Sequence, residues 1–258
     1  GSSLTHGRGN PRRETDDKIE YYGRAIRAWK PGDGNALLAH CHFGRGQARA
    51  ARGEFAEAEP DLSRTFELDL RNAAAFLLRG RVRLSLDRPR EAASDLAEYA
   101  SLKPEDSEGF IALGNAEFKA RALKASLRAF DRAARLDPGD FRPALGTARI
   151  RMARKDFRSA LEAFDAAEEL AKGGDASVLA GRAECRFALG EPERGVKDYD
   201  QAIPIEESRL QDLRRAQAAP FEVSASQERL ALDYAGRGRL KEFLVWLASA
   251  LADYRQAC

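Results

Sequence analysis

The segment from residue 107 to residue 140, SEGFIALGNAEFKARALKASLRAFDRAARLDPGD, carries the pattern that decides the fold. Apolar side chains recur three or four residues apart over 110–120 and again over 123–136, which is the spacing of one buried helical face. The second stretch is followed by Asp137-Pro138-Gly139-Asp140, and a proline cannot continue a helix and disfavours helical geometry in the residue before it. The segment therefore predicts two helices with a break near Arg121.

The same pattern recurs along the chain at intervals of 34 or 35 residues. One series holds small residues, and three others in the same register begin at Ala58, Leu62 and Thr65. The small-residue series is Gly46, Gly80, Gly114, Ala148 and Ala183. Four series that agree over five units predict a repeat array in which stacking supplies the core. The predicted units are 39–72, 73–106, 107–140, 141–174 and 175–209.

The composition favours helices throughout. Alanine occurs 47 times, whereas Val, Ile and Thr together occur 15 times, and β-branched residues are the ones that strands prefer. A sandwich, a barrel or a doubly wound sheet is therefore excluded. The 43 basic and 41 acidic residues nearly cancel, so the overall charge gives no sign of a nucleic-acid binder. RNA binding by the Arg-rich first helices is kept as an alternative. The longest apolar run, 243–252, is too short to span a bilayer.

These residues resemble the tetratricopeptide repeat, a 34-residue helix–turn–helix that stacks into a right-handed α-solenoid. The resemblance covers about residues 39–209 and implies an all-α fold. The third unit fits best, with the family's key positions occupied by Phe110, Leu113, Gly114, Ser126, Phe130, Ala133 and Pro138. Two positions depart from the family. The seventh, usually Leu, is Arg in the first, second and fifth units, and the eleventh, usually aromatic, is Arg in every unit except the third. We interpret the methylene stems of these arginines as covering apolar surface, while their guanidinium heads reach water or acids. An anion-binding ladder is the alternative.

The two ends depart from the register. Residues 17–34 resemble the second helix of a preceding unit, and residues 1–16 are expected to be a disordered tail or a cloning scar, so the natural N-terminus can lie upstream. Residues 210–258 are expected to form a C-terminal helical cap. Within it we predict a helix ended by Pro220 and then a helical pair around Gly236-Arg237-Gly238. A partner groove or a self-association surface around Trp246 is the alternative.

No pattern of catalytic residues is present. The sequence lacks a nucleophile elbow, a phosphate loop and a dinucleotide fingerprint, so we expect a non-enzymatic protein without a cofactor. The run His40-Cys41-His42 is not a metal site, because adjacent helical residues do not converge on one ion. Three cysteines without a CxxC pair favour a reducing compartment, and we expect a cytoplasmic location.

The resemblance places the binding surface on the concave side, which the first helices line. Fifth, ninth and twelfth positions share one helical face, so they predict two apolar rows with a polar row between them. The predicted peptide-binding residues are Phe43, Gln47, Leu77, Arg81, Leu84, Ile111, Asn115, Phe118, Lys119, Leu145, Arg149, Met152, Glu184 and Phe187. Apolar side chains of a ligand would enter between units, and Arg81, Asn115 and Arg149 would bind its backbone or acidic groups. The alternative is that the apolar rows only complete the packing of neighbouring helices.

The sequence therefore predicts a scaffold that binds a protein or an acidic-apolar peptide. Self-assembly through the terminal helices is one alternative function. The other is a regulatory interaction domain within a larger protein.

Overall fold

The computed structural model describes residues 11–257, and the side chains of 13–249. The described residues form helices and contain no strand. In chain order the helices are α1 (Pro11–Ala28), a short 3-10 helix (Pro31–Asp33), α2 (Asn35–Ala51), α3 (Phe55–Leu68), α4 (Ala73–Ser85), α5 (Pro89–Leu102), α6 (Ser107–Lys119), α7 (Leu123–Leu136), α8 (Arg142–Ala153), α9 (Phe157–Ala171), α10 (Ala176–Ala188), α11 (Pro192–Arg215) and α12 (Pro220–Ala257). Two compact units result, unit 1 with α1–α6 and unit 2 with α7–α12.

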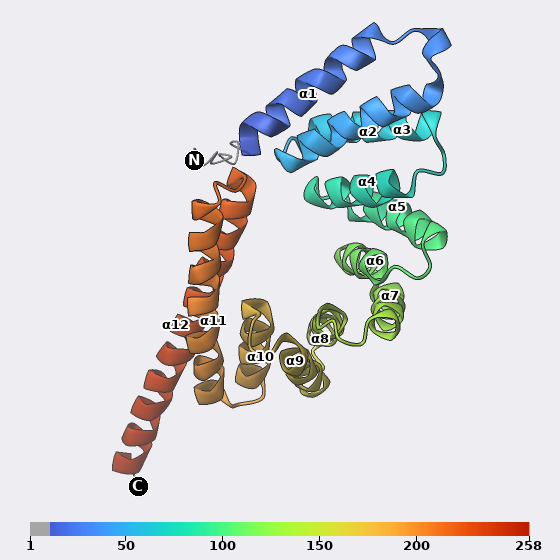
Figure 1. The fold of residues 1–258 in the computed structure, drawn as a ribbon. Coiled ribbons are helices and arrows are strands. Elements are labelled where there is room, and N and C mark those ends of the chain that lie inside the picture. Colours follow the sequence, from blue (N-terminus) through green and yellow to red (C-terminus); the bar gives the residue numbers. More distant parts are fainter. Residues whose placement is uncertain (1–10, 258) are drawn as a thin grey trace, which may run out of the picture. The chain divides into compact units, whose positions relative to one another are not determined.

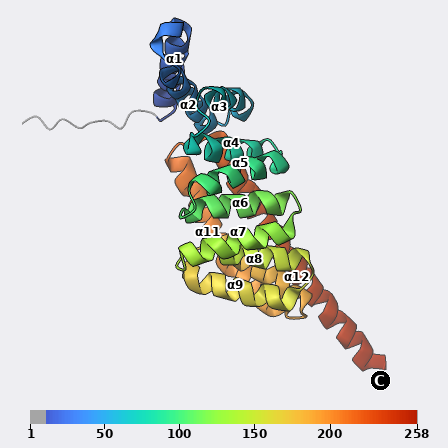
Figure 2. The same cartoon turned by 90° about the vertical axis from the view of Figure 1, so that its right-hand side faces the viewer.

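The helices pair as the repeat predicts. In both views the second helix of a pair lies along the first, as α3 does on α2, α5 on α4, and α9 on α8 (Figures 1 and 2). A residue with positive φ stands at the same repeat position in the turn of every pair. These residues are Gly53, Asp87, Arg121, Lys155 and Gly190. The break predicted near Arg121 is therefore a tight left-handed turn. None of the helices in the described part of the chain is long and apolar enough to cross a membrane.

Small residues lie where the two helices of a pair cross. A Cβ added to Gly46 would lie 3.0 Å from Cγ of Leu62, and one added to Gly80 would lie 2.7 Å from Cγ of Leu96. Both leucines are fully buried, so they have no room to move aside. The small-residue series at 34-residue intervals is therefore a packing requirement, as the sequence predicts.

A second set of glycines lies between successive pairs. At five places an aromatic ring of one second helix packs on a glycine of the following helix, where an added Cβ would lie 2.3 or 2.4 Å from a ring carbon or the hydroxyl oxygen. The contacts are Tyr22 on Gly44, Tyr99 on Gly109, Phe130 on Gly146, Phe164 on Gly181 and Tyr199 on Gly236. Since Gly236 belongs to α12, this helix packs on α11 as the first helix of a further pair would.

Three boundaries differ from the prediction. The helical pair expected around Gly236-Arg237-Gly238 is wrong, because α12 is continuous from Pro220 and Gly236 serves a close helix contact instead of a turn. The helix expected to end at Pro220 is the end of α11, and the proline begins α12, where its missing N–H costs little. At the other end, α1 starts at Pro11, so part of the expected tail is helical. Residues 1–10 lie outside the described part.

Candidate peptide-binding face

The arginines at the seventh repeat position, and those at the eleventh except Arg151, bind aspartates of the second helix; Arg151 donates to the backbone carbonyl of Ser159 at 2.9 Å. In three repeats, two arginines one helical turn apart donate hydrogen bonds to one buried carboxylate. The three triads are Arg45 and Arg49 with Asp61, Arg79 and Arg83 with Asp95, and Arg182 and Arg186 with Asp198. The guanidinium groups of these six arginines bind acids of the same repeat. This confirms the interpretation that their heads reach acids, and it excludes an anion-binding ladder at these six positions.

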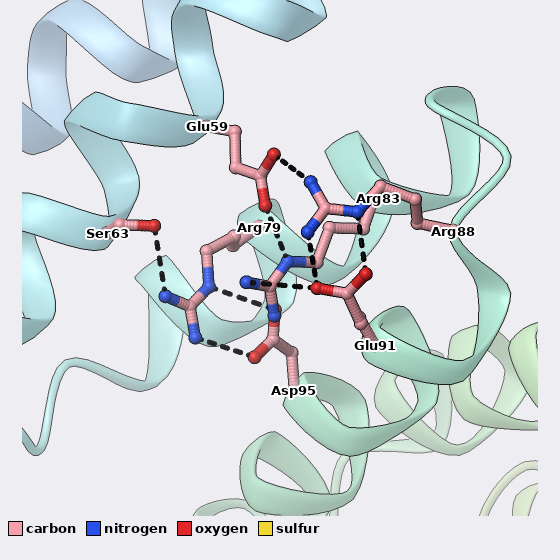
Figure 3. Close-up of polar contacts among 7 residues, drawn as sticks. All are labelled: Glu59, Ser63, Arg79, Arg83, Arg88, Glu91 and Asp95. Atoms are coloured by element: carbon pink, nitrogen blue, oxygen red, sulfur yellow. Dashed lines mark hydrogen bonds and ion pairs between the residues drawn. The ribbon is translucent and has the colours of Figure 1, made fainter.

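The second triad shows the geometry (Figure 3). Nε and Nη2 of Arg79 bind the two oxygens of Asp95 at 3.0 and 2.8 Å, and Nη1 of Arg83 adds a third bond at 2.8 Å. Nε of Arg83 also donates to Glu59 at 2.9 Å, and Arg88 binds the other oxygen of that carboxylate. Because Glu59 lies on α3 and Arg83 on α4, this network also joins two successive repeats.

The first triad includes a histidine. Nδ1 of His42 lies 3.0 Å from Oδ1 of Asp61. Burial would raise the pKa of Asp61, but hydrogen bonds from Arg45 and His42 and the charges of Arg45 and Arg49 outweigh it and hold that pKa below its usual value. His42 is therefore part of a charge network. No group of three or more His, Cys, Asp or Glu side chains that could hold a metal ion occurs among the residues described.

A sequence signal for these triads exists that the periodicity analysis missed. The spacing Arg-x3-Arg-x11-Asp occurs in the same register in the first, second and fifth repeats. The third repeat has Leu113 at the seventh position and Ala129 at the aspartate position, and the fourth repeat has Thr147 and Ala163 there. Both partners change together because a lone buried charge is costly.

In unit 1 the predicted binding residues divide by exposure. The exposed ones are Gln47, Arg81, Asn115 and Lys119, and the half-buried ones are Phe43, Leu77, Leu84 and Phe118. Phe43 packs against the cluster of Ala58, Leu62 and Val82 while part of its ring faces solvent. Ile111 is buried, so it fills the core and is removed from the candidate face.

Arg81 already has an acidic partner. Its Nη2 lies 2.5 Å from Oε1 of Glu108, and both side chains are exposed. Such a surface ion pair contributes little to stability, so Arg81 can exchange Glu108 for a carboxylate of the ligand.

In unit 2 the predicted residues separate into core and pocket positions. Leu145 is buried in the cluster around Phe164, with Met152 packed against it, so Leu145 is also removed from the candidate face. The ring of Phe187 meets Phe243 of α12 edge to face, with centroids 5.3 Å apart. In unit 2 neighbouring helices cover these apolar side chains, which agrees with the packing alternative at these positions.

The two charged residues of the polar row in unit 2 differ in their contacts. Glu184 accepts hydrogen bonds from Oη of Tyr199 at 2.6 Å and from Nη2 of Arg239 at 2.7 Å. Arg149 makes no hydrogen bond or ion pair with any described residue, and burial lowers the pKa of its guanidinium. Both line one pocket of unit 2.

These stacked helical hairpins define an α-solenoid repeat protein. A sequence profile of the tetratricopeptide repeat matches residues 43–107, 77–141 and 145–210, which is more than half of the chain. The chain belongs to the tetratricopeptide repeat family, and its class is that of protein-interaction scaffolds.

Solved structures of other proteins share the fold. A tetratricopeptide repeat protein from Parabacteroides merdae is 17% identical, with a TM-score of 0.64 over 88% of this chain and 100% of its own. MamA is 18% identical, with a TM-score of 0.56 over 67% of this chain and 94% of its own. YrrB, described as a repeat protein with an unusual peptide-binding site, is 20% identical, with a TM-score of 0.54 over 77% of this chain and 99% of its own. Among curated protein sequences none matches.

Proposed function

We propose that the protein is a non-enzymatic scaffold that binds an extended or helical peptide on the first helices of unit 1. The observation that carries the proposal is the side-by-side arrangement of α2, α4 and α6, each of which contacts the next. Together they present exposed polar side chains flanked by half-buried apolar ones. A surface of this kind suits a peptide that inserts apolar side chains and hydrogen-bonds through its backbone.

The polar groups of this face are free to bind. Gln47 and Asn115 are exposed and make no hydrogen bond with other described residues, so each amide offers a donor and an acceptor to a peptide backbone. Arg81 can exchange Glu108 for an acidic group of the ligand. Burial of three or four apolar side chains at about 1.5–3 kcal/mol each, less the ordering costs, suggests roughly micromolar affinity. YrrB, whose title names a peptide-binding site, shares this fold and supports a peptide as the first ligand to test.

The test selects ligands from a library of displayed 12-residue peptides and measures the affinity of the best one by calorimetry. Gln47→Ala with Asn115→Ala should weaken binding at least about tenfold without changing helicity, because two backbone-binding amides are lost. The matched control is Glu57→Ala with Glu98→Ala, two exposed side chains of second helices. A library that yields no ligand, or equal affinity in both double variants, would contradict the proposal.

Self-association through α12 is a second candidate function. Val245 and Trp246 lie next to each other on this helix, and the Trp246 side chain is 63% exposed. An exposed tryptophan beside another apolar residue is typical of an interface. Light scattering over a concentration series tests it, with Trp246→Ala as the variant that should lower the mass. A constant monomer mass would reject it.

Two further expectations concern context. A role as the interaction domain of a larger protein is decided by the full reading frame. A cytoplasmic location is checked by fractionating the source cells.

A further inference from the structure

Unit 2 contains a charged pocket that the peptide face of unit 1 does not use. It has a volume of about 330 Å³ and is lined by side chains of α8, α10, α11 and α12. Its wall includes small and apolar residues of α10 together with Leu232 of α12. Six charged side chains also line it, namely Arg149, Glu184, Glu206, Arg229, Asp233 and Arg239.

Four of these charges neutralise one another. Glu206, which is buried, accepts hydrogen bonds from Oγ of Ser226 at 2.7 Å and from Nε of Arg229 at 3.0 Å. Glu184 binds Arg239 at 2.7 Å. Two acids and two arginines are thus satisfied within the protein.

The other two charges make no hydrogen bond and no ion pair with the described residues. Asp233 is only 7% exposed, yet within the described residues its carboxylate makes no hydrogen bond and no ion pair. Burial and the charge of Glu206 raise its pKa to about 6, although the charge of Arg229 acts in the opposite direction, so Asp233 is mostly ionised at pH 7. Arg149 is half-buried and also makes no hydrogen bond or ion pair with a described residue; burial lowers the pKa of its guanidinium, and the charge of Asp175 opposes this shift. Asp233 is buried and Arg149 is half-buried, so two charges of opposite sign that make no hydrogen bond in one pocket call for an explanation.

We propose that this pocket binds a group that carries both a cationic nitrogen and a carboxylate. The ammonium or guanidinium of the ligand donates to the carboxylate of Asp233, and the guanidinium of Arg149 donates to the ligand carboxylate. Arg binds planar carboxylates through two parallel hydrogen bonds, and the low exposure of the Asp233 carboxylate strengthens its contact with the cation. The volume suits a single amino acid or one charged segment of a peptide.

Two sources supply this chemistry, and calorimetry with two probes distinguishes them. One probe is free L-arginine. The other is a peptide with blocked ends, Ac-AKAAEA-NH2, whose only charges are one lysine and one glutamate. Binding of the first probe alone assigns the site to a free amino acid, and binding of the second assigns it to a peptide.

The variants are Asp233→Asn and Arg149→Gln, each with a matched control. Each variant should lower the affinity for the probe that binds at least about tenfold, because one charge-assisted contact is lost. The controls are Glu242→Gln on α12 and Arg158→Gln on α9, which are exposed and outside the pocket. If neither probe binds up to about 10 mM, a Kd that corresponds to only about 3 kcal/mol, the inference is overturned. Equal affinity in the pocket variants and the wild type would also overturn it.

Stability supplies a readout that does not depend on the probes. Because Asp233 makes no hydrogen bond or ion pair, Asp233→Asn should raise the melting temperature of the protein at pH 7 while it weakens binding, whereas loss of a structural carboxylate would lower the melting temperature. A lower melting temperature would overturn the premise. The affinity should also fall as the pH drops through about 6, since protonation removes the charge that binds the cation. Both variants lie in unit 2, so peptide binding on unit 1 should be unaffected and the two proposals fail separately.

Discussion

Removal of the carboxylate of Asp198 tests whether the arginine triads hold the repeats together. This side chain accepts from Arg182 at 2.7 Å and from Arg186 at 2.6 Å, and the arginine side chains are only 12% and 20% exposed. Asp198→Ala would leave two guanidinium groups desolvated without their acid. Breaking a buried ion pair on one side costs about 3–5 kcal/mol, and Arg182 retains a weak contact with Asp165 at 3.4 Å. We therefore expect a loss of about 3 kcal/mol in the free energy of unfolding.

The triple variant Arg182→Leu, Arg186→Leu and Asp198→Ala should recover most of that loss. Replacement of a whole buried ion pair by apolar residues is often neutral or stabilising, and the third repeat already has Leu113 with Ala129 at two of these positions. We expect the triple variant to lie within about 1 kcal/mol of the wild type.

Urea denaturation followed by circular dichroism measures the total change, and hydrogen exchange of α10 and α11 locates it. Asp200→Ala is the matched control on the same helix. Its partner Arg237 lies at 3.0 Å in an exposed pair, so the loss should stay below about 1 kcal/mol. The reasoning is refuted if Asp198→Ala is as stable as this control, or if the triple variant is as unstable as the single one.

Three further predictions follow from packing and burial. Gly236→Ala should lower the melting temperature because the added Cβ would lie 2.3 Å from Oη of Tyr199. Gly238→Ala, whose Cβ would have no atom within 4 Å, should instead stabilise the protein by about 0.5–1 kcal/mol through helix propensity. Equal effects of the two changes on the melting temperature would indicate a turn at this place. The pKa of Asp233 in the folded protein, about 6, lies above its unfolded value of 3.8, so the native state binds more protons between the two, and stability falls as the pH rises through 6. Asp233→Asn should therefore be more stable than the wild type by up to about 3 kcal/mol at pH 8 and equal to it below pH 4 in urea titrations, and a constant difference would contradict this. Burial raises the pKa of Cys185 to about 11, so iodoacetamide should modify it, by peptide mapping, only as fast as the helices open; labelling as fast as in urea would argue against its burial.

Local spacing was sufficient for the repeat and for its turns. A period of 34 residues with small side chains at fixed positions requires helices that cross closely, and Gly46 and Gly80 lie where such crossings occur. The turn residue Gly53 was also recognisable, because a glycine between two helical patterns signals a left-handed conformation.

The same local rule failed at the C-terminal end. Gly236 and Gly238 look like a turn in the sequence, yet α12 is continuous, because the first glycine admits the ring of Tyr199 from another helix. The candidate site was predictable only in part for a similar reason. Repeat positions show which face a residue occupies, but burial of Ile111 and Leu145 depends on how closely neighbouring helices pack.

Sequence periodicity was thus enough to establish the helical hairpins, their register and the family, since these depend on contacts within one repeat or between adjacent ones. The tertiary structure alone decided which charges are neutralised. Asp198 forms ion pairs with two arginines, whereas Asp233 and Arg149 lie in one pocket and make no hydrogen bond or ion pair with the described residues. The reason is that an ion pair depends on distances of a few ångströms between side chains from different helices, and the packing of α8, α10 and α12 sets those distances.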